Sequence, residues 1–243
     1  MQPVHSVLIV EDEPIIAMML EEYLDLLGHD VTGTADNVSE ALAIVDGGGF
    51  DLAILDVSLR DGVECWPVAD ALAARGIATF RYNFPYSERG GGRDSQAVCT
   101  ETIRSAVRAA HEAAPDLTLL AGGHSFGGRM TTTAQSEQPI ENVAGLVLFS
   151  FPLHLPGRPD TKRAEHLANI KIPLLFLAGT RDELATLDLL KPAVKMLGKH
   201  ATLHLIDTAN HSYKVLKKSR SSDEDVFAEM ARVTDNWAAS KLS

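Results

Sequence analysis

The stretch that decides the fold is Leu117-Thr118-Leu119-Leu120-Ala121-Gly122-Gly123-His124-Ser125-Phe126-Gly127. Residues 117–121 form an apolar run that predicts a buried strand, and residues 123–127 match the pattern G-x-S-x-G. Where this pattern joins a strand to a helix, the chain makes a sharp turn that lifts the serine hydroxyl above the end of the sheet. So short a pattern also occurs in glycine-rich turns that merely end a strand. Ser125 is therefore a candidate nucleophile whose role depends on partners elsewhere in the chain.

Asp182 and His211 are the candidate partners. Asp182 follows a strand predicted at residues 174–178, and His211 follows the last predicted strand, residues 202–206. In the arrangement that uses this turn, the triad runs in the order serine, acid, histidine, with each partner after a later strand. Asp182 could instead cap a helix that begins near residue 184, and His211 could be a surface histidine. Their order and placement favour Ser125, Asp182 and His211 as the catalytic residues.

Other polar residues fit these roles less well. Asp207 is the runner-up acid, because it precedes the loop that carries His211. His124 is adjacent to Ser125, but the predicted turn points it the wrong way to act as the base. Four further histidines are interpreted as structural or solvent-exposed: His154, His166, His200 and His204.

Strands and helices alternate along the whole chain. Strands are predicted at residues 7–10, 31–35, 52–55, 78–84, 117–121, 146–151, 174–178 and 202–206, and helices at 14–27, 39–45, 63–75, 95–113, 127–137, 184–197 and 223–241. Several strands are apolar almost throughout, which is typical of parallel strands covered on both faces. The pattern predicts the α/β class, a three-layer sandwich with a mostly parallel sheet of about eight strands. We expect one continuous domain over residues 1–243, since neither glycine-rich segment (47–49 and 87–94) is long enough for an interdomain linker.

From about residue 69 to the end, the chain resembles a small α/β-hydrolase of the dienelactone-hydrolase-like superfamily. The strings that carry the resemblance are LAARGI at 72–77, RYNFPY at 81–86, GGHSFGGRM at 122–130, FPLH at 151–154, GTRD at 179–182 and NHS at 210–212. The resemblance implies ester-type hydrolysis, with Ser125, Asp182 and His211 at the family's triad positions.

Residues 1–68 are similar to a different family, the flavodoxin-like response-regulator receiver. The similar strings are VLIVEDEP at 7–14, LAILD at 52–56 and LRDG at 59–62. In that family the acidic pair (Glu11 and Asp12 here) and the aspartate after the third strand (Asp56 here) hold magnesium and accept phosphate. Clustered carboxylates at strand ends suit such a hard cation. The receiver-like part stops before the threonine and lysine that complete the phosphoryl switch. We therefore interpret Asp12 and Asp56 as retained carboxylates without a working switch, with magnesium binding as the alternative.

The junction of the two parts affects the expected oxyanion hole. The hydrolase-like part lacks the first strands of the family and the His-Gly-type loop that supplies the second oxyanion amide. The backbone N–H of Phe126 is the first donor. We expect the strand that ends at Asp56 to replace a missing hydrolase strand, so that the N–H of Val57 or Ser58 is the second donor. Loss of one such donor lowers turnover roughly a hundred- to a thousandfold, so we expect a modest enzyme that prefers activated esters.

The composition excludes several other classes of function. The formal net charge is -11 and no long basic run is present, which disfavours nucleic acids and anionic membranes as partners. The two cysteines, Cys65 and Cys99, belong to no CxxC or Cys/His cluster, which argues against a disulfide framework or a zinc site. With no long apolar segment, the protein is expected to be soluble and cytoplasmic. A chimera of two parallel folds, natural or engineered, often leaves an exposed sheet edge, which favours a homodimer.

The expected mechanism is acyl transfer on a small-molecule ester, without a cofactor. His211 takes the proton of Ser125, Asp182 orients His211, and water later releases the acyl group. The pocket walls are expected to include Tyr86, Phe151 and Leu153, together with Phe126. Phosphoesters and lactones remain open as substrates. Two rival readings are a signalling module phosphorylated at Asp56 and a catalytically silent binding protein on a hydrolase scaffold.

Overall fold

The computed structural model describes residues 6–10, 21, 30–35, 52–55, 70–89 and 92–241. The chain divides into two compact units, Met1–Pro67 with Pro85–Arg93 and Val68–Phe84 with Asp94–Ser243. The boundary near residue 68 coincides with the change of resemblance along the sequence. The single domain expected over residues 1–243 stays a prediction.

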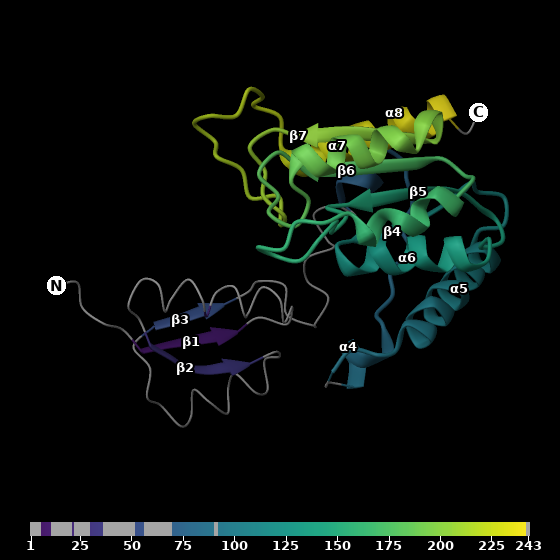
Figure 1. Cartoon of the computed structure of the whole chain (residues 1–243). Coiled ribbons are helices and arrows are strands. Elements are labelled where there is room, and N and C mark those ends of the chain that lie inside the picture. Colours follow the sequence, from purple (N-terminus) through teal and green to yellow (C-terminus); the bar gives the residue numbers. More distant parts are fainter. Residues whose placement is uncertain are drawn as a thin grey trace. The chain divides into compact units, whose positions relative to one another are not determined.

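The first unit contains a parallel sheet of three strands. They are β1 (Ser6–Val10), β2 (Asp30–Ala35) and β3 (Leu52–Leu55), in the order β2-β1-β3. Val7 lies opposite both Val31 and Leu52, so the central strand is paired on both sides, as Figure 1 shows. These strands confirm the three predicted from the sequence in this region. The short helix α4 (Pro85–Arg89) is assigned to this unit as well.

Several predictions in the first unit fall on residues that the structure does not describe. They are the magnesium candidates Asp12 and Asp56, the oxyanion candidates Val57 and Ser58, and the helices expected at 14–27 (apart from Glu21) and 39–45.

The second unit contains a parallel sheet of four strands in the order β4-β5-β6-β7. The strands are β4 (Leu119–His124), β5 (Val143–Phe149), β6 (Leu174–Gly179) and β7 (Ala201–Ile206). The α-helices are α5 (Gln96–Ala113), α6 (Phe126–Glu137), α7 (Leu187–Met196) and α8 (Val226–Lys241), and two short 3₁₀ helices span Lys162–Asn169 and Gly198–His200. Each strand and α-helix overlaps one predicted from the sequence.

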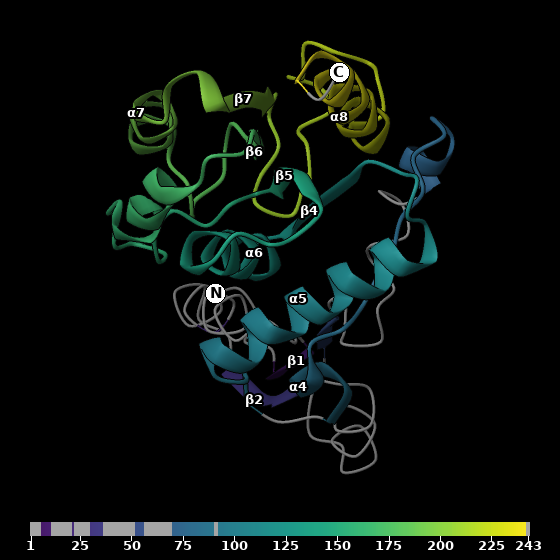
Figure 2. The ribbon, with the colours of Figure 1, turned by 90° about the vertical axis from the view of Figure 1, so that its right-hand side faces the viewer.

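Alternate residues of the strands face two separate cores. Leu146 and Phe176 pack in the core shared with α5, α6 and α7, whereas Val147 and Leu175 pack with Met230 of α8. Figures 1 and 2 show α8 on one face of the sheet and α5 and α6 on the other. Helices therefore cover both faces, and the three-layer α/β class expected from the apolar strands is confirmed.

The part of the chain that the structure describes has fewer strands in one sheet than the sequence predicts. Among the described residues, the strands form sheets of three and four rather than one sheet of about eight. The strand expected at residues 78–84 has no regular secondary structure, and Phe80 and Tyr82 are exposed there. Its aromatic residues favour a strand, but a strand also needs a neighbour for its backbone hydrogen bonds, and no described strand pairs with this segment.

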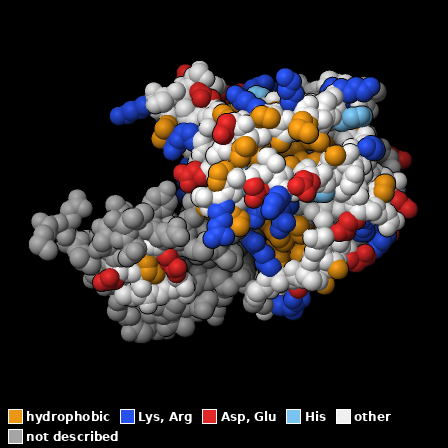
Figure 3. All heavy atoms as spheres, in the orientation of Figure 1, with side chains coloured by type: hydrophobic (Ala, Val, Ile, Leu, Met, Phe, Trp, Pro, Cys, Tyr) orange, Lys and Arg blue, Asp and Glu red, His pale blue; other side chains and the backbone are white. Residues whose placement is uncertain are grey.

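The visible surface of the second unit carries charged side chains of both signs. Figure 3 shows acidic and basic side chains interspersed with apolar ones on the visible face of the second unit. None of the described helices is both long and apolar enough to cross a bilayer.

Candidate active site

Ser125 lies at a strained turn between β4 and α6. Its φ of 47° and ψ of -113° place it in a region that residues with a side chain rarely adopt. The turn is held on both sides: the N–H of Ser125 donates to Phe149 O at 2.9 Å, and the N–H of Arg129 donates to Ser125 O at 3.1 Å. A Cβ at Gly128 would lie 2.7 Å from Gly123 O, so the chain before and after Ser125 can come this close only with glycine. This is the sharp turn that the G-x-S-x-G pattern predicts.

Parallel pairing brings the candidate partners to the same end of the sheet. His124 is in register with Phe149 on β5, and Gly179 on β6 is in register with Ile206 on β7. The residues that follow these positions leave the sheet at its carboxyl edge, where ligands usually bind in parallel α/β folds.

Ser125, His211 and Asp182 form a continuous chain of hydrogen bonds. His211 Nε2 lies 2.9 Å from Ser125 Oγ, and His211 Nδ1 lies 2.9 Å from each carboxylate oxygen of Asp182. Because a carboxylate can only accept, Nδ1 carries the hydrogen and Nε2 is the acceptor for the serine hydroxyl. The Asp182 side chain is fully buried and that of His211 is 12% exposed, so little water competes for these bonds.

The loop after β6 holds the Asp182 carboxylate. Leu184 N–H donates to Asp182 Oδ1 at 2.8 Å. The helix α7 begins only at Leu187, and Thr186 is its N-cap. Asp182 is therefore not the cap of that helix, which removes the alternative reading of this residue.

The loop that carries His211 is held by its own polar groups and by one phenol. Asn210 Oδ1 accepts from the N–H groups of Ser212 and Lys214, at 3.2 and 2.8 Å. Tyr213 O–H donates to Leu177 O on β6 at 2.8 Å. Burial raises the pKa of Tyr213, so the phenol remains a donor throughout the working pH range.

His124 contacts the backbone of His211 rather than Ser125 Oγ. Its Nε2 lies 3.0 Å from His211 O, and its ring centroid lies 5.2 Å from that of His211 and 6.1 Å from that of Tyr213. By surface area His124 is exposed, although protein atoms surround its ring closely enough to weaken its hydration. Burial of the ring among these neighbours, followed by the charge of His211, lowers the pKa of His124 to about 4. The motif predicts that His124 is not the base, but its place next to Ser125 does not reveal which loop its ring contacts.

Asp207, the runner-up acid, is bound elsewhere. Its Oδ2 accepts from both the N–H and the hydroxyl of Ser221, each at 2.8 Å. These hydrogen bonds from Ser221 lower the pKa of the Asp207 carboxyl. Its carboxylate therefore braces the loop before α8, while Asp182 is the acid that meets His211.

The predicted pocket residues lie in three places: the core of the second unit, helix α4 and the start of α6. Phe151 and Leu153 are 2% and 0% exposed and belong to the core under α5, α6 and α7, so they offer no surface to a substrate. Tyr86 lies in α4, which is assigned to the first unit. Phe126 is the first residue of α6 and directly follows Ser125.

An aromatic row lies beside the nucleophile turn instead. The Phe84 ring centroid is 5.7 Å from that of Phe126 and 6.0 Å from that of Tyr82, both in edge-on contacts. The Arg129 guanidinium lies 5.5 Å from the centroid of Phe126. Tyr82 and Phe84 alternate in the sequence, a pattern that predicts a strand and does not by itself indicate this aromatic row.

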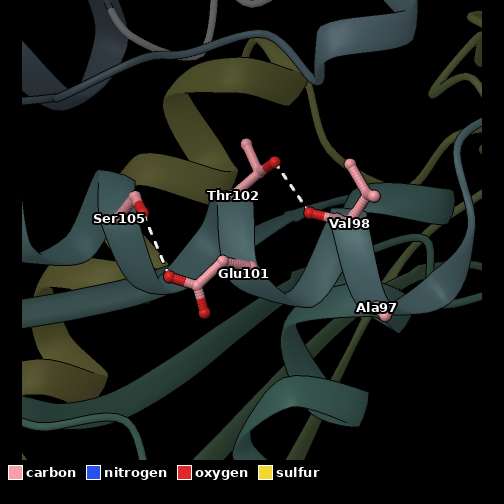
Figure 4. A pocket seen from close by; sticks show the side chains of 5 residues that line it. All are labelled: Ala97, Val98, Glu101, Thr102 and Ser105. Atoms are coloured by element: carbon pink, nitrogen blue, oxygen red, sulfur yellow. Dashed lines mark hydrogen bonds between the residues drawn. The ribbon is translucent and has the colours of Figure 1, made fainter.

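A separate pocket lies against α5, away from these residues. Its volume is about 460 Å³. The side chains that line it are Ala97, Val98, Glu101, Thr102 and Ser105, and Figure 4 shows them along one side of the helix. No member of the hydrogen-bonded chain lines this pocket. Among the described residues, no group of three or more His, Cys, Asp or Glu side chains could hold a metal ion.

Two family models match successive parts of the chain. Residues 7–67 match the response regulator receiver domain, and residues 66–239 match an alpha/beta hydrolase domain. The transcriptional regulatory protein TcrA of Mycobacterium tuberculosis is 40% identical over 86 residues, which cover 31% of this chain and 34% of TcrA. The match thus spans about a third of the length of that relative.

Two of the solved structures similar to this chain are an esterase domain and a serine hydrolase homologue. The esterase domain of a Rhodothermus marinus protein has a TM-score of 0.53 and 19% identity, over 73% of this chain and 80% of that chain. An alpha-beta serine hydrolase homologue from Coxiella burnetii has a TM-score of 0.52 and 19% identity, over 73% of this chain and 75% of that chain. At this identity the similarity shows the shared fold alone. With a family model that covers most of its length, the chain belongs to the α/β-hydrolase family and carries a response-regulator receiver segment ahead of the hydrolase domain.

Proposed function

We propose that this hydrolase cleaves small, activated carboxylic esters through an acyl-enzyme on Ser125. The observation that carries the proposal is the chain of 2.9 Å contacts from Asp182 through His211 to Ser125 Oγ. An ordinary surface serine lacks both the strained backbone and the ordered base that Ser125 has.

In the proposed mechanism, His211 accepts one proton and then donates it again in each half-reaction. As Ser125 Oγ bonds to the ester carbon, His211 Nε2 takes the hydroxyl proton and the carbonyl electrons move onto oxygen. When the tetrahedral intermediate collapses, the carbon–oxygen bond to the alcohol breaks and Nε2 returns the proton to the departing alkoxide. Water then attacks the acyl-enzyme by the same route and releases the acid and free Ser125. Asp182 keeps Nδ1 protonated and stabilises the imidazolium while His211 holds the proton.

The start of α6 supports stabilisation of the oxyanion. Phe126, the first residue of the helix, contributes its backbone N–H where the helix dipole is positive. The second donor that we propose, the N–H of Val57 or Ser58, lies outside the described residues. With a single donor, turnover would be lower roughly a hundred- to a thousandfold.

The aromatic row supports an apolar group on the substrate. Phe126 directly follows Ser125, and its ring contacts Phe84, which in turn contacts Tyr82; such rings favour an acyl chain or an aromatic leaving group. The similarity to the esterase domain of the Rhodothermus marinus protein agrees with an ester substrate. Lactones and phosphoesters are the alternative substrates of the same residues.

Hydrolysis of p-nitrophenyl acetate and butyrate by the full chain tests this proposal. We expect saturable release of p-nitrophenol by the parent, and loss of nearly all of it in Ser125→Ala. Ser105→Ala is the matched control, because Ser105 lies on α5 and bonds to Glu101 there. Equal rates for the parent and Ser125→Ala would refute the nucleophile and favour a silent binding protein.

The receiver match supports a second candidate function. Asp56 directly follows β3, at the position where the receiver family accepts phosphate. If this function is present, radiolabelled acetyl phosphate labels the parent chain and not Asp56→Asn. Equal labelling of both chains would contradict it.

A further inference from the structure

The loop that carries His211 is anchored to both of the other strands that supply the triad. From β6, Leu177 O accepts the hydrogen of Tyr213. From the end of β4, His124 Nε2 reaches His211 O itself, at 3.0 Å. The second anchor thus ties the residue before the nucleophile to the backbone of the base.

The chemistry of this contact determines which nitrogen of His124 carries hydrogen. A carbonyl oxygen can only accept, so Nε2 of His124 must be the donor. The same bond therefore persists in the neutral ring, which is the form that its lowered pKa maintains near neutral pH. His124 acts here as a neutral donor and needs no change of charge.

The backbone of the anchored loop is strained on both sides of His211. Thr208 and Tyr213, on either side of His211, both have a φ of 59°, a conformation that such residues rarely adopt. Strained backbone of this kind persists only when surrounding contacts over-determine it. A hydrogen bond to the carbonyl of His211 fixes the peptide plane next to its Cα, and so the direction in which its ring leaves the backbone.

We propose that His124 is a positioning residue, which holds His211 at hydrogen-bond distance from Ser125 through its bond to the His211 carbonyl. This inference rests on the proposed function of Ser125 and His211. A displacement of about 1 Å in a catalytic group can lower turnover a hundredfold, so loss of the anchor acts on kcat. We expect KM to change little, because His124 is bonded to the His211 carbonyl rather than to Ser125 Oγ.

Three substitutions separate the hydrogen bond from the packing of the ring. In His124→Gln the amide nitrogen is as many bonds from Cα as Nε2 of histidine, so the bond to His211 O is kept. His124→Asn carries the same amide one methylene shorter and cannot reach. His124→Phe keeps a ring but has no donor. Because His124 is exposed, these changes leave no closed cavity.

The test measures kcat and KM for p-nitrophenyl butyrate in the full chain. We expect His124→Phe and His124→Asn to lose roughly ten- to a hundredfold in kcat, with KM within about twofold, and His124→Gln to stay within about threefold of the parent. Equal kcat in His124→Gln and His124→Asn would overturn the proposal, whether both are active or both inactive. Circular dichroism shows whether each variant is folded. If His124→Phe does not fold, the comparison of kcat between His124→Gln and His124→Asn tests the proposal.

A proton spectrum provides a readout that needs no turnover. The hydrogen between His211 Nδ1 and Asp182 gives a far-downfield NMR signal, assigned by its loss in His211→Gln. We expect this signal to shift or broaden in His124→Phe and to persist in His124→Gln. An unchanged signal in His124→Phe overturns the positioning role, whereas an inactive parent with a normal signal refutes the proposed function alone.

Discussion

Ser125 Oγ and His211 Nε2 lie 2.9 Å apart although they are 86 positions apart in the chain. This contact requires that two separate strands and a loop all be correctly placed. Ser125 N–H is bonded to β5 through Phe149 O, while His211 is held by Asp182 on one side and by His124 on the other. The site is therefore a property of the second unit as a whole rather than of the motif that first indicates it.

Asp182→Asn should abolish most of the turnover without unfolding the protein. An asparagine amide at this position can donate to Nδ1, which moves the hydrogen of His211 to Nε2 and removes the acceptor for Ser125. A change of this kind lowers kcat by about ten-thousandfold in a well-ordered triad. Steady-state kinetics with p-nitrophenyl butyrate measure it.

Asp207→Asn is the matched control for that substitution. Asp207 bonds to Ser221 and not to His211, so we expect kcat within about threefold of the parent. If Asp207→Asn were the inactive variant and Asp182→Asn the active one, the acid would be assigned to the wrong strand.

Gly122→Ala should destabilise the second unit. A Cβ at Gly122 would lie 1.9 Å from Val147 O on the paired strand, and the three nearest atoms are all backbone atoms of Val147, which cannot move aside as a side chain can. Overpacking of this kind lowers the free energy of unfolding by about 1–3 kcal/mol, or more where backbone must move. Urea unfolding followed by circular dichroism gives the change.

Gly127→Ala tests whether the destabilisation by Gly122→Ala comes from the contact of its Cβ with Val147 O. At Gly127 a Cβ would meet no described atom within 4 Å, and alanine favours the helix α6 in which this residue lies. We expect its free energy of unfolding to equal or exceed that of the parent. Equal destabilisation by both alanines would contradict the packing argument.

Stability should fall as the pH is lowered from about 6.5 toward about 4. Burial lowers the pKa of His124 to about 4, and burial lowers the pKa of His166 as well. In this window the unfolded chain binds protons at these histidines that the folded chain does not, so the free energy of unfolding rises with pH. Urea unfolding at pH 7.5, 6.0 and 5.0 follows the trend.

The share of His124 in that trend can be isolated by substitution. His124→Gln has no group that titrates there, so its stability should depend on pH less steeply than that of the parent between pH 7.5 and 5.0. Parallel pH dependences of the two proteins would show that His124 is not held neutral by its surroundings.

Much of the hydrolase unit could be predicted because its signals are local. Apolar runs of strand length marked β4, β5, β6 and β7, and the glycines around Ser125 marked the turn. Chain order then indicated Asp182 and His211, since parallel strands bring their carboxyl ends to one edge.

The parts that could not be predicted depend on contacts between distant segments. Nothing at residues 78–84 reveals the absence of a paired neighbour among the described strands, so an aromatic run was read as a strand. Phe151 and Leu153 follow a strand end, as a pocket residue would, yet their side chains turn into the core. The bond from His124 to the His211 backbone joins the end of β4 to a loop, and only the folded sheet brings the two together.

The most direct measurement of the central claim is mass spectrometry of the full chain after reaction with a fluorophosphonate, which modifies activated serines. The account predicts one adduct, on the peptide that contains Ser125. It predicts none in Ser125→Ala and slow modification in Asp182→Asn. An unmodified parent, or an adduct of equal yield in Ser125→Ala, would contradict the claim that Ser125 is an activated nucleophile.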